Sequence, residues 1–278
     1  MSAVDILPLV PAFAILVCVP LTLRAVGPGG SSGRVLIAAY PVAAIFGAVS
    51  ILVPAGVVAA LLAIPWLLFT AVAALHGVTR ALATWRRVEQ LCIAVGFMYL
   101  SIGGAWFVIW RSGIPVLGFG AHVPLLTAIH FHFAGFASPI LVGFVGRELR
   151  AGASRAWPVY AAAAVLVLIG PALVALGIAG VRPVESPAAA ILAVGTATAA
   201  LLGLAILTRR IRTTAARALL AISFGSAVVA MTLALMYAVG NPLAVSAIGL
   251  EDMVRWHGSL NALGYVSCGL LAWNVSRQ

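Results

Sequence analysis

The sequence contains no lysine and only six acidic residues among its 278. Charged side chains make up 8% of the chain and hydrophobic ones 64%, and the mean hydropathy is +1.18. This composition excludes a water-soluble domain of this length, because such a domain would expose large apolar patches. The chain is therefore predicted to be a multi-pass protein of the cell membrane, with the lipid bilayer as its main partner.

The basic charge comes from sixteen arginines, which give a net charge of +10. They lie in small groups between apolar stretches and do not form a basic face with interleaved aromatics, so nucleic acid is excluded as a partner. Cysteine is also scarce. Cys18, Cys92 and Cys268 fall inside apolar stretches without metal-ligand spacing, which predicts buried thiols and no disulfide. The first apolar run lacks the features of a signal peptide and is predicted to span the membrane.

A transmembrane helix needs about 20 predominantly apolar residues. Nine stretches meet that length, so we predict an all-α, polytopic transmembrane helical bundle of about nine spans, with residues 1–278 in a single transmembrane domain. The predicted spans are Ile6–Leu23, Val35–Val53, Ala55–Leu75, Leu91–Trp110, Ala121–Val145, Trp157–Ala179, Pro187–Leu207, Ala218–Val239 and Met253–Trp273. Only Pro54 and Gly56 separate the second and third, so a single re-entrant hairpin is the structural alternative there.

The arginines indicate an orientation. With the N-terminus outside, thirteen arginines fall on the cytoplasmic side, and only Arg111, Arg182 and Arg255 fall on the other. This asymmetry follows the positive-inside rule and would be lost if any two spans merged. We therefore predict an N-terminus outside and a cytoplasmic C-terminus. Most tryptophans lie near span ends, where indole rings anchor among headgroups, and Trp66 alone is predicted in mid-span.

Polar side chains inside a bilayer are costly, which makes each of them a candidate for function. Two motifs concentrate them: HFHFAGF at 130–136 in the fifth span, and HGSLNALGY at 257–265 in the ninth, just after Glu251 and Asp252. At ~1.5 Å per residue, His130 and Asn261 lie ~13 Å and ~12 Å from the outer ends of their spans. The two motifs therefore occupy overlapping depths.

Spacing within each motif limits which side chains can act together. His257 and Asn261 are four residues apart and share one helical face, which could form a polar pocket with His130 or His132. His130 and His132 are about 200° apart on an ideal helix, so both face one pocket only if Gly135 or nearby prolines distort the turn. The alternative is that each histidine only joins neighbouring helices through a hydrogen bond.

The predicted site has two parts. The candidate catalytic residues are His130, His132, His257, Asn261 and Asp252, and the candidate substrate-binding residues are Phe133, Phe136, Trp106 and Tyr99. Two other acids, Glu89 and Glu148, lie beside arginines and are interpreted as interfacial ion pairs.

The leading hypothesis is a membrane-embedded enzyme that performs acid–base chemistry on an apolar, lipid-like small molecule. Histidine titrates near neutrality, and aromatic faces stabilise carbocations, which makes isoprenoid cyclisation the specific reaction we favour. A metal-dependent variant places His130 or His132 with His257 and Asp252 around zinc or iron, although H-x-H is poor ligand spacing on a helix, and the cofactor stays unknown. The rival functions are a proton-coupled carrier that uses the same histidines and a structural subunit.

The two motifs resemble those of the YndJ-like family of bacterial membrane proteins. The paired histidines before Ala-Gly-Phe match, as do His-Gly, Leu-Asn-Ala and a final glycine followed by an aromatic residue. Tyr265 stands where the resemblance leads us to expect phenylalanine. The resemblance implies a multi-pass membrane protein, some relatives of which are longer, and supports the choice of site more than any activity.

Overall fold

The computed structural model describes residues 7–116, 118–120, 122–178, 182–207, 211, 213–240 and 249–276. Within these ranges the regular structure is helical and no strand is present, which confirms the all-α prediction. The chain divides into two compact units, residues 1–84 with 94–137 (unit 1) and residues 85–93 with 138–278 (unit 2). The single domain expected from the sequence stays a prediction.

Eight helices in the described part of the chain are long and apolar enough to cross a membrane. They are Leu7–Val26, Ser31–Leu52, Val57–Thr84, Val88–Ser112, His122–Ala151, Trp157–Gly177, Val184–Ile206 and Thr214–Ala238. They coincide with the first eight predicted spans and confirm a multi-pass membrane protein. The ninth predicted span is also helical, from Leu250 to Val275, but it carries the polar side chains of the second motif and is not among the eight. The orientation of the termini stays a prediction.

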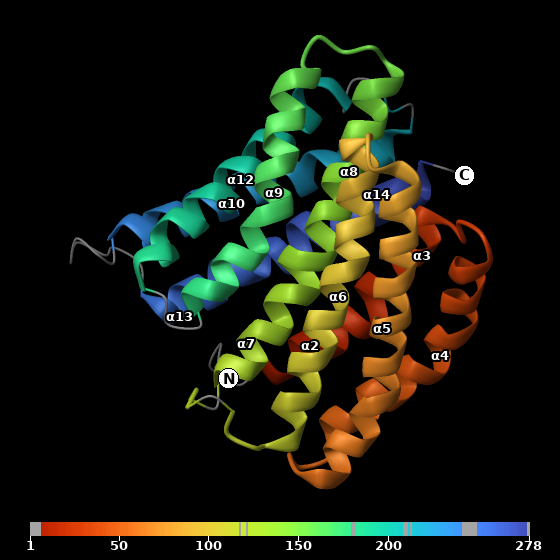
Figure 1. Cartoon of the computed structure of the whole chain (residues 1–278). Helices are drawn as coiled ribbons and strands as arrows, with labels where there is room; N and C mark the ends of the chain where they lie inside the picture. Colours follow the sequence, from red (N-terminus) through yellow and green to blue (C-terminus); the bar gives the residue numbers. More distant parts are fainter. Residues whose placement is uncertain are drawn as a thin grey trace. The chain divides into compact units, whose positions relative to one another are not determined.

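Unit 1 holds the first three spans and the first histidine motif. Its elements are η1 (Leu7–Leu9), α2 (Val10–Phe13), η2 (Ala14–Cys18), α3 (Val19–Val26), α4 (Ser31–Leu52), α5 (Val57–Thr84), α6 (Val88–Ser112) from residue 94 onward, α7 (His122–His130) and η3 (Phe131–Ala137). Helices α4 and α5 run side by side in opposite directions and are joined by a short turn (Figure 1).

Arg111 stabilises the turn between the second and third spans through hydrogen bonds. Helix α4 ends at Leu52, Val53 is extended and α5 begins at Val57, so the division predicted at Pro54 and Gly56 is confirmed. The Gly56 amide donates to the Arg111 carbonyl oxygen over 2.9 Å, and the Arg111 guanidinium donates to the Val53 carbonyl. A buried arginine thus supplies partners for backbone groups that leave the helical pattern, as the bilayer requires.

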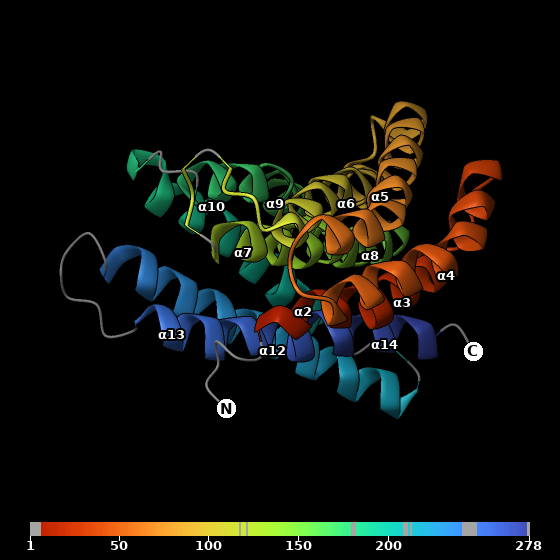
Figure 2. The ribbon, with the colours of Figure 1, turned by 90° about the horizontal axis from the view of Figure 1, so that it is seen from below.

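Unit 2 holds the second half of the fifth span, the spans that follow it and the second motif. Its elements are the first turns of α6, then α8 (Ser138–Ala151), α9 (Trp157–Ile178), α10 (Arg182–Leu202), η4 (Gly203–Leu207), α12 (Thr214–Gly240), α13 (Leu250–Asp252), η5 (Met253–Gly258), η6 (Leu260–Ser267) and α14 (Cys268–Val275). Helix α9 packs against α10, and the C-terminal helix formed by α13, η5, η6 and α14 lies along α12 (Figure 2).

The helix that carries the first motif is the most enclosed of the eight spans. In His122–Ala151, 78% of the apolar window is buried, against 28–50% in the other seven. Large apolar side chains such as Leu52, Val57 and Leu82 are instead 72–80% exposed, as expected where a helix faces lipid. The polar groups of this motif are therefore surrounded by protein, where they can find partners.

Candidate functional site

Both histidine motifs adopt π-helical turns. Element η3 covers Phe131–Ala137 in the first motif, and η5 and η6 cover Met253–Gly258 and Leu260–Ser267 in the second. Well under 1% of residues in soluble proteins are π-helical, and such turns are frequent at functional sites. His130 and His132 could face one pocket only if the helix were distorted. The π-helical turn of the first motif is such a distortion.

His132 is fully buried in unit 1, and both ring nitrogens have partners. The Trp66 indole N–H donates to Nε2 over 3.2 Å, and Nδ1 lies 2.7 Å from the Ala128 carbonyl oxygen. Because an indole can only donate and a carbonyl can only accept, the ring is the neutral tautomer protonated on Nδ1. His132 therefore connects α5 to the helix that carries the motif.

His130 has a different environment. It is half-buried, and its ring lies edge-on to Phe131 with centroids 5.3 Å apart. His130 is the last residue of α7, and His132 lies within the π-helical turn η3 that follows. The two histidines of the H-x-H pair thus have different neighbours and different exposure.

The four predicted substrate-binding aromatics all lie in unit 1 and contact other aromatic rings or are buried. Phe136 and Phe133 are 0% and 6% exposed, and Phe136 packs on Phe97 at 5.7 Å. Tyr99 contacts Phe131 at 5.6 Å, and Trp106 lies 6.1 Å from Phe119. Aromatic pairs at these distances stabilise a core, and the substrate role assigned to these residues stays a prediction.

His257 and Asn261 form a hydrogen-bonded pair in unit 2. His257 Nδ1 lies 2.8 Å from the Ala230 carbonyl oxygen on α12, so Nδ1 carries the proton and Nε2 presents its lone pair. The Asn261 amide nitrogen donates to this Nε2 over 3.1 Å and to the His257 carbonyl over 2.9 Å. Both side chains are half-buried. The predicted pairing at a spacing of four residues therefore exists as a direct contact.

Asp252 is exposed at the start of the C-terminal helix, and among the described residues it has neither a hydrogen bond nor an ion pair with His257. The first motif belongs to unit 1 and the second to unit 2, so the shared pocket expected from the sequence stays a prediction. Within the described ranges no group of three or more His, Cys, Asp or Glu side chains is arranged to hold a metal ion.

With this geometry in view, comparison with known proteins identifies the family. The model of the YndJ-like protein family matches residues 9–265, an interval that includes both histidine motifs. The chain belongs to the YndJ-like family. It is also 28% identical, over 241 residues, to the uncharacterized membrane protein YndJ of Bacillus subtilis (strain 168).

That alignment covers 86% of this chain but only 42% of the Bacillus YndJ protein, so the chain spans less than half the length of this relative. No solved structure matches the chain. The comparisons therefore support a membrane protein of the YndJ-like family, and the name of the relative states no activity.

In this YndJ-like chain, hydrogen bonds of Tyr265 join the C-terminal helix to α12 and α8 in unit 2. The Ser223 hydroxyl donates to the Tyr265 carbonyl oxygen over 2.6 Å, and the Tyr265 hydroxyl lies 3.4 Å from the Ser138 hydroxyl. Sequence reasoning did not single out Ser223 or Ala230, because neither shows a pattern of its own. It did place Trp66 in mid-span. Because a buried indole N–H needs an acceptor, this position indicates a partner such as His132.

Proposed function

We propose that this protein is a membrane-embedded enzyme that performs acid–base chemistry on a lipid-like substrate, with His257 as the group that exchanges the proton. One observation carries the proposal: Ala230 fixes the His257 ring through Nδ1, so Nε2 presents its lone pair at a half-buried position beside an amide side chain. A base oriented by an acceptor behind it is the arrangement that general-base catalysis uses.

The chemistry follows from these contacts. The Asn261 N–H first releases the lone pair of Nε2, which then takes a proton from the substrate, and the Ala230 carbonyl stabilises the imidazolium through Nδ1–H. The protonated Nε2 is then a donor, so the Asn261 side chain must rotate and offer its carbonyl oxygen instead of its N–H group. The imidazolium returns the proton in a later step, which leaves the enzyme unchanged. An asparagine suits this position because its amide serves either protonation state.

The surroundings of this pair favour an apolar substrate. Ala230 belongs to a cluster of buried residues with Ala193 and Met231, against which Leu260 and Leu235 pack. These buried side chains make the surroundings of the pair apolar, and a lipid-like molecule can approach the half-buried pair from the bilayer. Isoprenoids are the narrower class that we propose.

The test measures product formation in membranes supplied with prenylated substrates. His257→Ala is expected to reduce turnover by about 100-fold or more, the usual contribution of a positioned general base. Asn261→Ala is expected to reduce it by about tenfold, because it removes only the hydrogen-bond partner of that base. His130→Ala, His132→Ala and Asp252→Ala complete the predicted catalytic set. His122→Ala is the matched control, since His122 is an exposed histidine at the start of its span.

Two outcomes contradict the proposal. Wild-type turnover in His257→Ala and Asn261→Ala removes these residues from the chemistry. Solute uptake into proteoliposomes that responds to a pH gradient and disappears in the histidine variants, with no product formed, supports the carrier instead.

A further inference from the structure

A second site lies in unit 2, apart from His257, where α8 and α14 end. A cavity of about 180 Å³ is lined by residues near these two helix ends and by one residue from the segment before α12: Phe144, Arg147, Glu148, Ile211, Trp273 and Ser276. The lining combines two aromatic rings and an isoleucine with a cation, a carboxylate and a hydroxyl. Such a mixture fits a ligand that is polar at one end and apolar at the other.

Trp273 supplies the observation that points to a ligand. Its side chain is 6% exposed, and its indole nitrogen is buried without a hydrogen-bond partner within the described part of the chain. Buried indole N–H groups nearly always have an acceptor, because burying an unpaired donor is unfavourable. The side chain is held firmly by Phe144, whose ring centroid lies 5.3 Å away. The cavity is thus lined by a side chain whose donor has no acceptor among the described residues.

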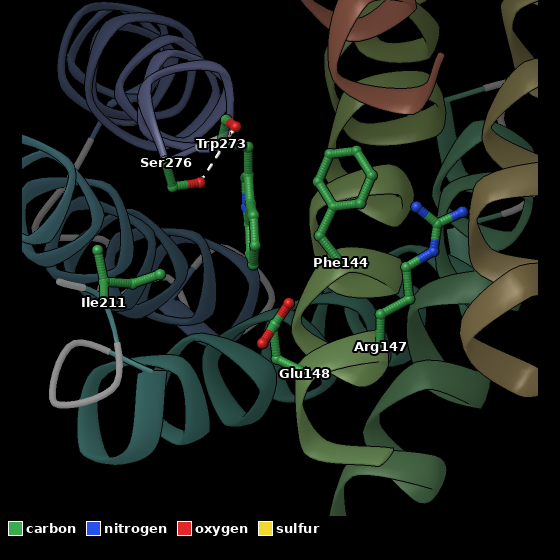
Figure 3. Close-up of a pocket in the computed structure, with 6 residues that line it drawn as sticks. All are labelled: Phe144, Arg147, Glu148, Ile211, Trp273 and Ser276. Carbon is green, nitrogen blue, oxygen red and sulfur yellow. Dashed lines mark hydrogen bonds between the residues drawn. The ribbon is translucent and has the colours of Figure 1, made fainter. Parts of the chain in front are cut away.

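Glu148 indicates that the ligand also carries a cationic donor. Its carboxylate points toward the rims of the Trp273 and Phe144 rings, and Arg147 extends on the far side of Phe144, where it donates to Gln90 over 3.1 Å (Figure 3). A carboxylate accepts several hydrogen bonds, so Glu148 can take an ammonium group in addition to its neighbours in the protein. A ligand that fits both groups carries an acceptor, such as a phosphate, close to an ammonium.

We propose that this cavity binds the headgroup of an amine-bearing phospholipid of the phosphatidylethanolamine type. The Trp273 N–H donates to a phosphate oxygen, the Glu148 carboxylate accepts from the primary ammonium, and Phe144 and Ile211 contact the apolar part of the lipid. The position agrees with this ligand, since α8 and α14 end within a few residues of the cavity and span ends lie at headgroup level. Soluble phosphoethanolamine shares the headgroup chemistry and is distinguished in the experiment.

The experiment measures lipid retained by the purified full chain, with native mass spectrometry after exposure to mixed micelles. The lipids are phosphatidylethanolamine, phosphatidylcholine and phosphatidylglycerol with identical acyl chains. We expect preferential retention of phosphatidylethanolamine, because the choline group has no N–H to donate and the glycerol headgroup has no ammonium. Trp273→Phe keeps an aromatic ring but removes the donor, and is expected to lower retention about tenfold, the usual effect of one hydrogen bond to a charged group. Trp256→Phe is the control at an exposed tryptophan of the same unit.

Glu148→Gln is the second variant and decides the question even if Trp273→Phe fails to fold. It is expected to remove the preference for phosphatidylethanolamine over phosphatidylcholine. Equal retention of the three lipids by the wild type, full retention by Trp273→Phe, or an unchanged preference in Glu148→Gln overturns the proposal. An excess of phosphoethanolamine that does not displace the lipid supports the bilayer as the source of the ligand. Displacement, with the soluble compound bound in its place, overturns the lipid assignment.

Discussion

The Trp66 indole N–H donates to His132 Nε2 over 3.2 Å, and the two rings stack nearly parallel with centroids 5.9 Å apart. Both residues are completely buried, so neither polar edge reaches water or lipid headgroups. Because hydrocarbon offers no hydrogen-bonding groups, the Trp66 N–H and His132 Nε2 satisfy each other. This contact joins α5 to the π-helical turn of the first motif.

Trp66→Phe is therefore expected to destabilise the protein. The change leaves His132 Nε2 buried without a donor and replaces the indole with a smaller ring, which together cost about 2–4 kcal/mol. Thermal unfolding in detergent measures the effect. Trp85→Phe is the control because Trp85 is 63% exposed, and equal melting temperatures for the two variants would show that the Trp66–His132 contact contributes little.

Two glycines of the second motif are predicted to behave in opposite ways. A Cβ on Gly264 would lie 2.5 Å from the Ser226 Cβ, whereas a Cβ on Gly258 would meet nothing within 4 Å. Gly264→Ala should therefore destabilise the packing of the C-terminal helix on α12 by about 1–3 kcal/mol. Gly258→Ala should be neutral or stabilising by up to about 1 kcal/mol, because alanine favours a helix. Unfolding measurements compare the two.

Ser226→Gly provides a rescue for the same contact. It removes the atoms that a methyl group at position 264 would meet, so the double variant should recover part of the stability lost in Gly264→Ala. Equal stability of the two single alanine variants would contradict this close approach of the helices.

Hydropathy predicts the first eight spans because a membrane helix is predominantly apolar over about 20 consecutive residues, a property that can be read from the local sequence. The contacts of the motifs are a different kind of fact. Nothing near His132 indicates that an indole 66 positions earlier supplies its donor. Likewise, the carbonyl that orients His257 belongs to Ala230, a residue whose side chain has no polar group.

The π-helical turns could not be predicted either. The 200° separation of His130 and His132 holds for an α-helix, and it no longer applies once the backbone widens at Phe131–Ala137. Gly135 suggests a site of close approach, and it does lie against Tyr99, with 3.1 Å from its would-be Cβ to the Tyr99 Cβ. A glycine alone, however, does not specify which backbone irregularity follows.

Glu89 is expected to show strong coupling between two arginines in unit 2. Its side chain is 0% exposed, and Oε1 lies 2.8 Å from Arg87 Nε and 3.1 Å from Arg150 Nε. The sequence placed Glu89 beside Arg87, but only the fold adds Arg150. Each single arginine variant leaves the carboxylate one partner, and the double variant leaves it buried without either.

Arg87→Ala and Arg150→Ala should each cost about 1 kcal/mol, since both side chains are 41–52% exposed. The double variant should cost more than their sum by about 1–2 kcal/mol, because it strands a buried charge. A double-mutant cycle on unfolding free energies measures this excess. Strictly additive costs would mean that water or another group replaces the arginines.

The C-terminal helix provides the sharpest test of topology. If Leu250–Val275 crosses the membrane, residues 249 and 278 lie on opposite sides, and the arginine distribution puts residue 278 in the cytoplasm. An alkaline phosphatase fused after residue 249 should then be active, and a green fluorescent protein fused after residue 278 should fluoresce. With only eight spans and the N-terminus outside, phosphatase would be active at both positions. The second outcome would leave His257 and Asn261 on a helix that lies along the surface of the membrane, where a half-buried imidazole meets headgroups and water instead of an apolar substrate.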